Sequence, residues 1–263
     1  MRLWYQSFAR VSEFGAYSAA LRGSLDEAAD PETHIEFHGI EKGGGIADQY
    51  RYIEHLDTRE VIENAIRAQR EGFDAFLLGN IADPGLAEIR EVLDIPALGL
   101  CQTSLHLACM MGRRYGMVTI NPKFTPRIAE NVRFYGLAEQ LAGIRLMQVP
   151  RLTSLGAAFS EARAMEEVRE QFAKAARECI ADGAEVLIPA GGVVMALLSA
   201  HGIRDIDGVP ILDGVPALVM MGEMAVKLRG ILGGFTSKAL SYAPPSGEVL
   251  EEIRRFYGAD TYR

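Results

Sequence analysis

The stretch EGFDAFLLGN, residues 71–80, decides the fold because its pattern returns as DGAEVLIPAG at residues 182–191. Each copy begins with an acidic residue and a glycine, and continues with an apolar run that ends in small residues. Downstream of each copy, a helical pattern leads to a second strand that starts at Ile95-Pro96 or Val209-Pro210. The repeat predicts two related halves, although short βα units can also resemble one another by chance.

Apolar runs alternate with amphipathic patterns along the rest of the chain, which is typical of parallel βα units. Strands are expected at about 2–7, 34–40, 73–79, 96–100, 115–120, 144–149, 184–190 and 209–213. Helices are expected at about 58–71, 84–93, 102–112, 124–135, 160–182, 214–230 and 246–257, the last with Ser246 as its cap. Most strands are continuously apolar, so helices should cover both faces of each sheet.

The composition narrows the possible partners. The chain has 263 residues and a formal charge of 27 − 35 = −8, which argues against a surface that neutralises nucleic acid or anionic lipid. No segment reaches the ~18 uninterrupted apolar residues of a membrane helix, and the first residues lack the apolar core of a signal peptide. The three cysteines form no CxxC pair, which favours free thiols in a reducing cytoplasm. A small molecule is therefore the expected partner, without nucleic acid or membrane.

The loops after the repeated strands carry the main candidates, because ligands of open parallel sheets sit beyond the carboxyl ends of the strands. Loops 80–85 and 191–194 are expected to face each other across one cleft. Asp83 would cap a helix that starts at Pro84, and the same helix end would suit a substrate carboxylate or an oxyanion. Gly191 and Gly192 would let the backbone approach a ligand, or would simply form a left-handed turn.

Other polar residues have a structural and a functional interpretation. Thr119 and Asn121 would donate hydrogen bonds to the same cleft, or would only cap the strand end. His106 is a candidate general base or a hydrogen-bonded helix residue. His34, Glu36 and His38 alternate along one strand face, where a solvated face is a better interpretation than a metal site.

The remaining sequence patterns argue against phosphate-binding and metal sites. The glycines at 43–45 lack phosphate-loop spacing and are interpreted as a mobile loop. No metalloprotease, serine-hydrolase elbow, EF-hand or zinc-finger spacing occurs, so no metal is expected.

Together these motifs resemble the aspartate/glutamate/hydantoin racemase superfamily, and most closely its hydantoin racemase branch. The resemblance covers about 58–230 and is carried by several motifs in order: LGNIADPGL at 78–86, PALG at 96–99 followed by HLA at 106–108, VT at 118–119, LIPAGG at 187–192 and GVPILDG at 208–214. It implies an α/β fold with two pseudo-symmetric lobes, each a parallel sheet flanked by helices, and an active site in the cleft between them. The expected bounds are 1–114 plus 215–235 for the first lobe, 115–214 for the second and 236–263 for a C-terminal extension.

The racemases of this superfamily use one cysteine from each lobe to remove and return a proton next to a carbonyl. At those positions this sequence has Asn80 and Gly191, which cannot shuttle a proton. Its own cysteines lie elsewhere: Cys109 and Cys179 fall inside expected helices, and Cys101 ends a strand, where core packing is the better interpretation.

The resemblance implies a cofactor-independent, racemase-like isomerase that acts on a small amino-acid derivative or cyclic amide without the usual two thiols. Asn80, Asp83 and His106 are the expected catalytic residues. Gln6, Thr119, Asn121, Gly191 and Gly192 are expected to bind substrate, and a homo-oligomer is expected. The alternatives are a decarboxylase or hydrolase on the same scaffold, and a non-catalytic binding protein.

Overall fold

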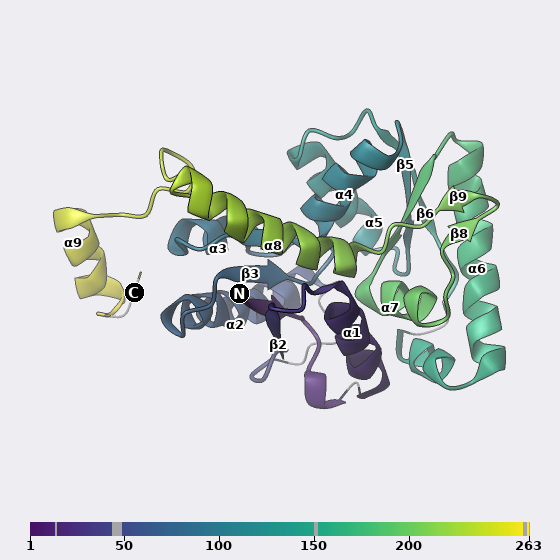
Figure 1. The fold of residues 1–263 in the computed structure, drawn as a ribbon, viewed down its shortest axis with the longest axis horizontal. Coiled ribbons are helices and arrows are strands. Elements are labelled where there is room, and N and C mark those ends of the chain that lie inside the picture. Colours follow the sequence, from purple (N-terminus) through teal and green to yellow (C-terminus); the bar gives the residue numbers. More distant parts are fainter. Residues whose placement is uncertain (14, 44–48, 150–151, 260–261, 263) are drawn as a thin grey trace.

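A computed structural model describes the chain except residues 14, 44–48, 150–151, 260–261 and 263. Two lobes lie side by side, each built on a parallel sheet (Figure 1). The first sheet has the order β2-β1-β3-β4, from β1 (Arg2–Gln6), β2 (His34–His38), β3 (Ala75–Leu78) and β4 (Ala97–Gly99). The second has the order β6-β5-β7, from β5 (Tyr115–Thr119), β6 (Leu141–Leu146) and β7 (Val186–Ala190). The expected α/β fold with two lobes is confirmed.

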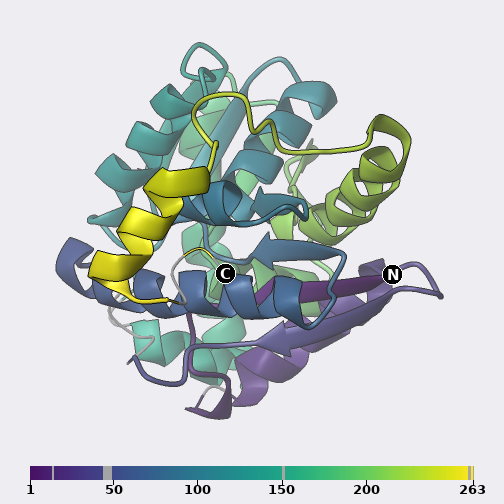
Figure 2. The same ribbon diagram turned by 90° about the vertical axis from the view of Figure 1, so that its left-hand side faces the viewer.

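Helices cover the sheets. Around the first sheet lie α1 (Gly15–Ala28), α2 (Arg51–Arg70), α3 (Leu86–Val92), α4 (Leu100–Met111) and α8 (Gly214–Leu232), with a short 3-10 turn, η1 (Val11–Glu13). The second lobe contains α5 (Phe124–Phe134), η2 (Leu152–Phe159), α6 (Ala162–Ala181) and α7 (Gly192–Ala200). The last helix, α9 (Gly247–Tyr257), stands apart at the left of Figure 1 and comes toward the viewer in Figure 2.

Burial follows the apolar pattern of the strands. Every residue of β3, β5 and β7 is buried, as expected for strands covered on both faces. The edge strands β2 and β6 are largely half-buried. The core therefore lies on both faces of β3, β5 and β7.

The two copies of the repeated stretch form the same local structure. Each follows a helix of 20 residues, α2 or α6, and each helix ends in a glycine with a left-handed backbone, Gly72 at φ +77° and Gly183 at φ +93°. The backbone N–H groups after each glycine return to the preceding turn, from Phe73 to the carbonyl of Ala68 and from Ala184 to that of Cys179. The acid-glycine pair is thus a matched helix-to-strand turn.

Some elements differ from the expected ones. The strand expected at 209–213 is reduced to the hairpin of β8 (Asp205–Ile206) and β9 (Val209–Pro210), with one parallel bridge between Leu187 and Ile211. Pro210 lacks the N–H group that a longer ladder requires. The strand expected at 144–149 begins earlier, at Leu141, where it pairs with Tyr115.

Helix α1 was not expected, whereas α7 is the helix expected between the second repeated strand and Val209. Ser246 does precede α9, but its side chain makes no capping hydrogen bond. The expected glycine loop at 43–45 lies outside the described residues from Gly44 onward.

The chain returns to the first lobe after it completes the second. Helix α8 packs against α1, α4, β3 and β4. The expected lobe bounds stay a prediction.

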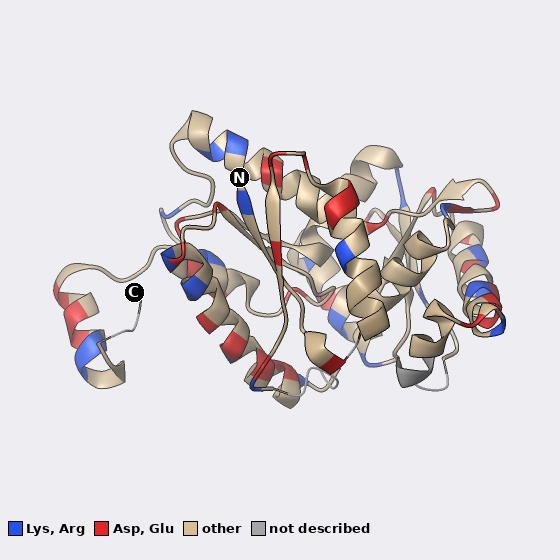
Figure 3. Cartoon of the chain, turned by 60° about the horizontal axis from the view of Figure 1, so that its bottom comes forward, with Lys and Arg blue, Asp and Glu red and all other residues tan. Residues whose placement is uncertain are grey.

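Charged residues of both signs share the surface. Helix α6, at the right of Figure 3, shows Arg next to Glu, including the ion pairs Arg163–Glu167 and Arg169–Glu166. None of the helices in the described residues is long and apolar enough to cross a membrane.

Candidate active site

The loop after β3 is folded by the side chain of Asn80. The Asn80 side-chain oxygen accepts the backbone N–H of Ala82 at 2.8 Å, and its backbone carbonyl accepts the N–H of Asp83 at 3.0 Å. Asn80 is 9% exposed. The residue expected to act in catalysis therefore also shapes the loop that carries it.

Asp83 caps a different helix from the one expected. Helix α3 begins at Leu86 after Gly85, whereas the Asp83 carboxylate accepts the N–H groups of Cys101 at 2.9 Å and Gln102 at 2.8 Å in the first turn of α4. The expected cap of a helix starting at Pro84 is wrong, because the left-handed backbone of Asp83, at φ +46°, turns its side chain toward α4.

The same carboxylate connects to the second lobe. The hydroxyl of Tyr135, just beyond α5, donates to Asp83 at 2.8 Å. Burial raises the pKa of Asp83 to about 6, although the N–H groups of Gln102 and Cys101 and the Tyr135 hydroxyl act in the opposite direction. Asp83 thus has three donors around it and holds the loop, α4 and α5 together.

His106 lies on an exposed face of α4. Its Nδ1 atom is 2.8 Å from the carbonyl oxygen of Gln102, one turn earlier, and its ring meets the ring of Tyr135 edge-on at 6.5 Å. His106 and Asp83 therefore share Tyr135 as a neighbour, with His106 on the solvent side.

Thr119 and Asn121 form the turn after β5. The Thr119 hydroxyl contacts the Asn121 backbone at 3.3 and 3.5 Å, and the Asn121 side-chain oxygen accepts the N–H of Lys123 at 2.9 Å. Both side chains make the local contacts of a strand-end cap.

Gly191 and Gly192 form the start of α7. Gly191 has an extended backbone at φ 174°, so the left-handed turn considered for this pair is not formed. A Cβ atom on Gly191 would lie 3.2 Å from the Ile120 side chain, and one on Gly192 would lie 2.9 Å from the Tyr17 hydroxyl. The glycines let two neighbouring elements approach this helix end closely.

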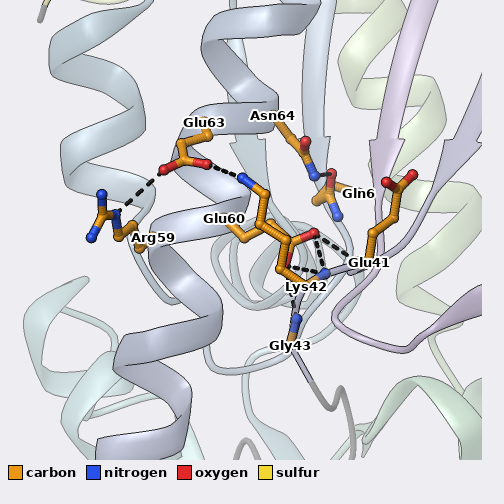
Figure 4. Close-up of polar contacts among 8 residues, drawn as sticks. All are labelled: Gln6, Glu41, Lys42, Gly43, Arg59, Glu60, Glu63 and Asn64. Atoms are coloured by element: carbon orange, nitrogen blue, oxygen red, sulfur yellow. Dashed lines mark hydrogen bonds and ion pairs between the residues drawn. The ribbon is translucent and has the colours of Figure 1, made fainter.

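Gln6 belongs to a polar network in the first lobe (Figure 4). Its side-chain oxygen accepts from the indole of Trp4 at 3.0 Å and the amide of Asn64 at 3.1 Å. Beside it, the Glu60 carboxylate accepts the N–H groups of three successive residues, Glu41, Lys42 and Gly43, at 2.6 to 3.1 Å. Gln6 is fully buried, and its backbone carbonyl accepts the N–H of Gly79 at 2.8 Å.

The expected site residues thus form three groups. Gln6 adjoins the Gly79–Asn80 loop through the backbone, and Asp83 adjoins His106 through Tyr135. The third group joins Thr119 and Asn121 to the α7 start, because Ile120 between them contacts Gly191.

The thiols of Cys101 and Cys179 are buried in the protein, although Cys101 adjoins the first loop through its backbone N–H bond to Asp83. Cys101 is fully buried in α4, and burial raises its pKa well above the usual value. Burial also raises the pKa of Cys179, in α6, to about 11. Raised values disfavour the reactive thiolate.

Two tyrosines near the loops had no signal in the sequence pattern. Tyr5 lies inside β1, with its hydroxyl 2.3 Å from where a Cβ atom of Gly79 would be. Tyr17 lies in α1 and meets Gly192. Both tyrosines lie inside a regular element, whereas the sequence pattern pointed to the loops at the strand ends.

The polar side chains of β2 interact with one another and with side chains of β1. Glu36 pairs with Arg2 at 2.9 Å and lies 3.8 and 3.6 Å from His34 and His38. His38 also stacks on Trp4, with ring centroids 3.4 Å apart. Within the described part of the chain, no group of three or more His, Cys, Asp or Glu residues is placed to hold a metal ion.

Comparisons with known proteins agree with this architecture. A sequence profile of the Asp/Glu/Hydantoin racemase family matches residues 16–222. Hydantoin racemase from Pseudomonas sp. (strain NS671) is 30% identical over 233 residues, which cover 88% of this chain and 87% of that protein. Hydantoin racemase from Paenarthrobacter aurescens is 32% identical over 195 residues, or 73% of this chain and 77% of that protein.

A solved structure shows the same fold. Allantoin racemase from Pseudomonas fluorescens has a TM-score of 0.79 at 24% identity, with 94% of this chain and 98% of that chain covered. The profile match, residues 16–222, includes both candidate loops. The chain belongs to the Asp/Glu/hydantoin racemase family.

Proposed function

We propose that the protein is a cofactor-independent isomerase that acts on a five-membered cyclic amide of the hydantoin class. The reaction would move the hydrogen of the ring carbon next to a carbonyl, through an enolate. The observation that carries this proposal is the 30% identity to a hydantoin racemase over 88% of this chain and 87% of the relative. A relationship of that extent supports a common substrate class, whereas the fold alone does not determine chemistry.

In this proposal the substrate lies between the loop of Asn80 and the start of α7. The N–H groups at the positive end of α7 would stabilise the negative oxygen of the enolate. Thr119 and Asn121 shape the neighbouring turn. Asp83 would hold the first loop in place rather than carry protons, because its carboxylate already accepts three hydrogen bonds.

Hydrogen exchange in D2O tests the function. Single enantiomers of 5-substituted hydantoins would be incubated with the protein, with loss of the ring C–H signal followed by NMR and loss of optical activity by polarimetry. Both losses should exceed those of a protein-free sample at the same pH, which controls for spontaneous racemisation. Release of CO2 or ring opening would instead show a lyase or a hydrolase, and binding without any turnover would show a binding protein.

Substitutions test the placement. Asn80→Ala should reduce exchange by at least ~10-fold, since both the loop shape and its polar group change. His34→Ala is a matched surface control, because His34 is exposed on β2. If Asn80→Ala, Asp83→Asn and His106→Ala each leave the exchange rate intact, the reaction does not occur at these loops.

A further inference from the structure

One polar face of the second lobe is bonded to the candidate loop after β3. Arg127, Asn131 and Tyr135 are spaced four residues apart, so they lie on one side of α5 and its C-terminal cap. The side-chain N–H of Asn131 donates to the carbonyl of Ala82 at 2.7 Å, and the Tyr135 hydroxyl donates to the carboxylate of Asp83 at 2.8 Å. This side of α5 therefore binds two successive residues of the loop.

Ala82 is held from both of its peptide groups. Its backbone N–H donates to the side-chain oxygen of Asn80 at 2.8 Å, and its carbonyl accepts the bond from Asn131. Ala82 is 1% exposed and Asn131 is 6% exposed, so solvent has little access to either bond. The conformation that Asn80 sets within its own loop is thus also fixed from the second lobe.

Arg127 fixes the orientation of the Asn131 amide. An amide side chain can turn either its oxygen or its N–H groups toward a neighbour, whereas arginine can only donate. The Asn131 oxygen therefore accepts from Arg127, at 2.7 Å, and the N–H groups are left for the carbonyl of Ala82. The Nε atom of Arg127 in turn lies 3.5 Å from the carboxylate of Glu54 in α2. The contacts form one connected chain between the two lobes.

We propose that Asn131 and Tyr135 are positioning residues, which hold the Asn80 loop in its reactive conformation from the second lobe. This proposal rests on the proposed function. Neither residue contacts the substrate; they act through Ala82 and Asp83, to which they are bonded. Because the loop belongs to the first lobe and its supports belong to the second, the site is complete only while the two lobes are in contact.

The test compares two variants of nearly unchanged shape with the wild type in the D2O exchange assay. Asn131→Asp replaces the N–H donor with an oxygen but keeps an acceptor for Arg127, and Tyr135→Phe removes only the hydroxyl. Each should lower kcat for exchange of the hydantoin hydrogen by at least ~10-fold while KM changes only a few-fold, because a displaced loop misaligns the reacting groups.

Glu130→Gln is the matched control. Glu130 also lies in α5 and also joins the lobes, through its ion pair with Arg51 of α2 at 2.6 Å. That pair is exposed and joins α5 to α2 rather than to the loop, and exposed ion pairs contribute little to stability. The kcat of Glu130→Gln should therefore stay near that of the wild type.

Amide hydrogen exchange followed by NMR examines the loop without any substrate. The backbone N–H groups of Ala82 and Asp83 are both bonded to Asn80. In Asn131→Asp and in Tyr135→Phe they should exchange at least ~10-fold faster than in the wild type, because the loop opens more often. The N–H of Met117, in the buried strand β5, reports the stability of the whole protein and should change less.

The outcomes distinguish the two proposals. Wild-type protein that exchanges no hydantoin hydrogen overturns the proposed function and the positioning role with it. Wild-type exchange with an unchanged kcat in both variants overturns the positioning role alone. A lower kcat with unchanged Ala82 and Asp83 amides also overturns it, because the two residues would then not act through the loop. Equal acceleration of the Met117 amide would assign the loss to general destabilisation instead.

Discussion

Asp83 accepts three hydrogen bonds through its carboxylate, from Cys101, Gln102 and Tyr135. It follows a repeated strand and precedes Pro84, a position that suits both capping and anion binding. The fold gives it a left-handed backbone, directs its carboxylate to α4 and adds the hydroxyl of Tyr135. Its partners lie 18 to 52 residues away, so no local pattern reveals them.

The ionisation of Asp83 makes stability depend on pH. Burial raises its pKa from 3.8 to about 6, so the ionised carboxylate is less favourable in the folded than in the unfolded chain. The protonated Asp83 side chain therefore adds to the free energy of unfolding. This contribution is fully present below about pH 4 and is lost as pH rises through about 6. At about 1.4 kcal/mol per pKa unit, the loss is on the order of 3 kcal/mol.

Urea unfolding of the wild type and of Asp83→Asn at pH 4 and pH 7 measures this effect. Between pH 4 and pH 7 the wild type should lose stability relative to Asp83→Asn. Asp26→Asn, at an exposed position of α1, is the control and should follow the wild type. A pH-independent difference between the wild type and Asp83→Asn would contradict the prediction.

Gly79 gives a second prediction for a single residue. A Cβ atom there would lie 2.3 Å from the hydroxyl oxygen of Tyr5 and 2.4 and 2.5 Å from two of its ring carbons, and Tyr5 is 1% exposed. Gly79→Ala should therefore destabilise the protein by about 1–3 kcal/mol through overpacking. Thermal unfolding measures the loss. Tyr5→Phe should not restore the stability of Gly79→Ala, because two ring carbons would still lie 2.4 and 2.5 Å from the added Cβ atom. An unchanged stability of Gly79→Ala would contradict the prediction.

At the scale of elements, the sequence predicted those parts of the fold where a residue type has a single structural role. Gly72 and Gly183 follow 20-residue helices and adopt left-handed backbones, so the acid-glycine pattern predicted both turns. Helix α1 was missed, and α7 was expected only as a helix without bounds before Val209, because it is apolar on nearly every face. Tyr5 and Tyr17 were missed as site residues for a related reason, since both belong to buried faces of regular elements.

The repeated turn predicts a paired result. Gly72→Ala and Gly183→Ala should each destabilise the protein by about 1–2 kcal/mol, because an L-residue is strained at φ +77° or +93°. Nothing lies within 4 Å of a Cβ atom on Gly72, so its loss would be due to the backbone alone.

Gly23 provides the opposite case. It lies inside α1, and nothing lies within 4 Å of an added Cβ atom there. Gly23→Ala should therefore raise stability by about 0.5–1 kcal/mol. Chemical denaturation of the three variants checks all the signs, and a stabilising Gly72→Ala would refute the argument.

At the scale of the whole molecule, the two lobes depend on each other through α8. This helix comes after the second lobe in the chain and packs on β3, β4, α1 and α4. Gly222 of α8 is so close to the first sheet that a Cβ atom would lie 2.7 Å from the Leu77 side chain. The first lobe is complete only after the second has been made.

Truncation tests this dependence. A chain that ends at Gly234 loses α9, which has no buried residue, and loses the hydrogen bonds from Lys238 to the carbonyls of Arg90 and Glu91. We expect a cooperative unfolding transition with a midpoint temperature within a few degrees of that of the full chain. A chain that ends at Asp213 lacks α8 and should show no cooperative transition by calorimetry. Loss of the transition in the chain that ends at Gly234, with a transition kept in the chain that ends at Asp213, would assign the stability to the C-terminal extension.

The return of α8 also restricts how the protein can move. The segment between α4 and α8 is joined to the first lobe at both of its ends, at Met111–Tyr115 and at Leu212–Gly214. A lobe held by two chain connections cannot swing freely about one linker. Its simplest remaining motion is a rotation about the line through both connections, which would open and close the two candidate loops together as a hinge.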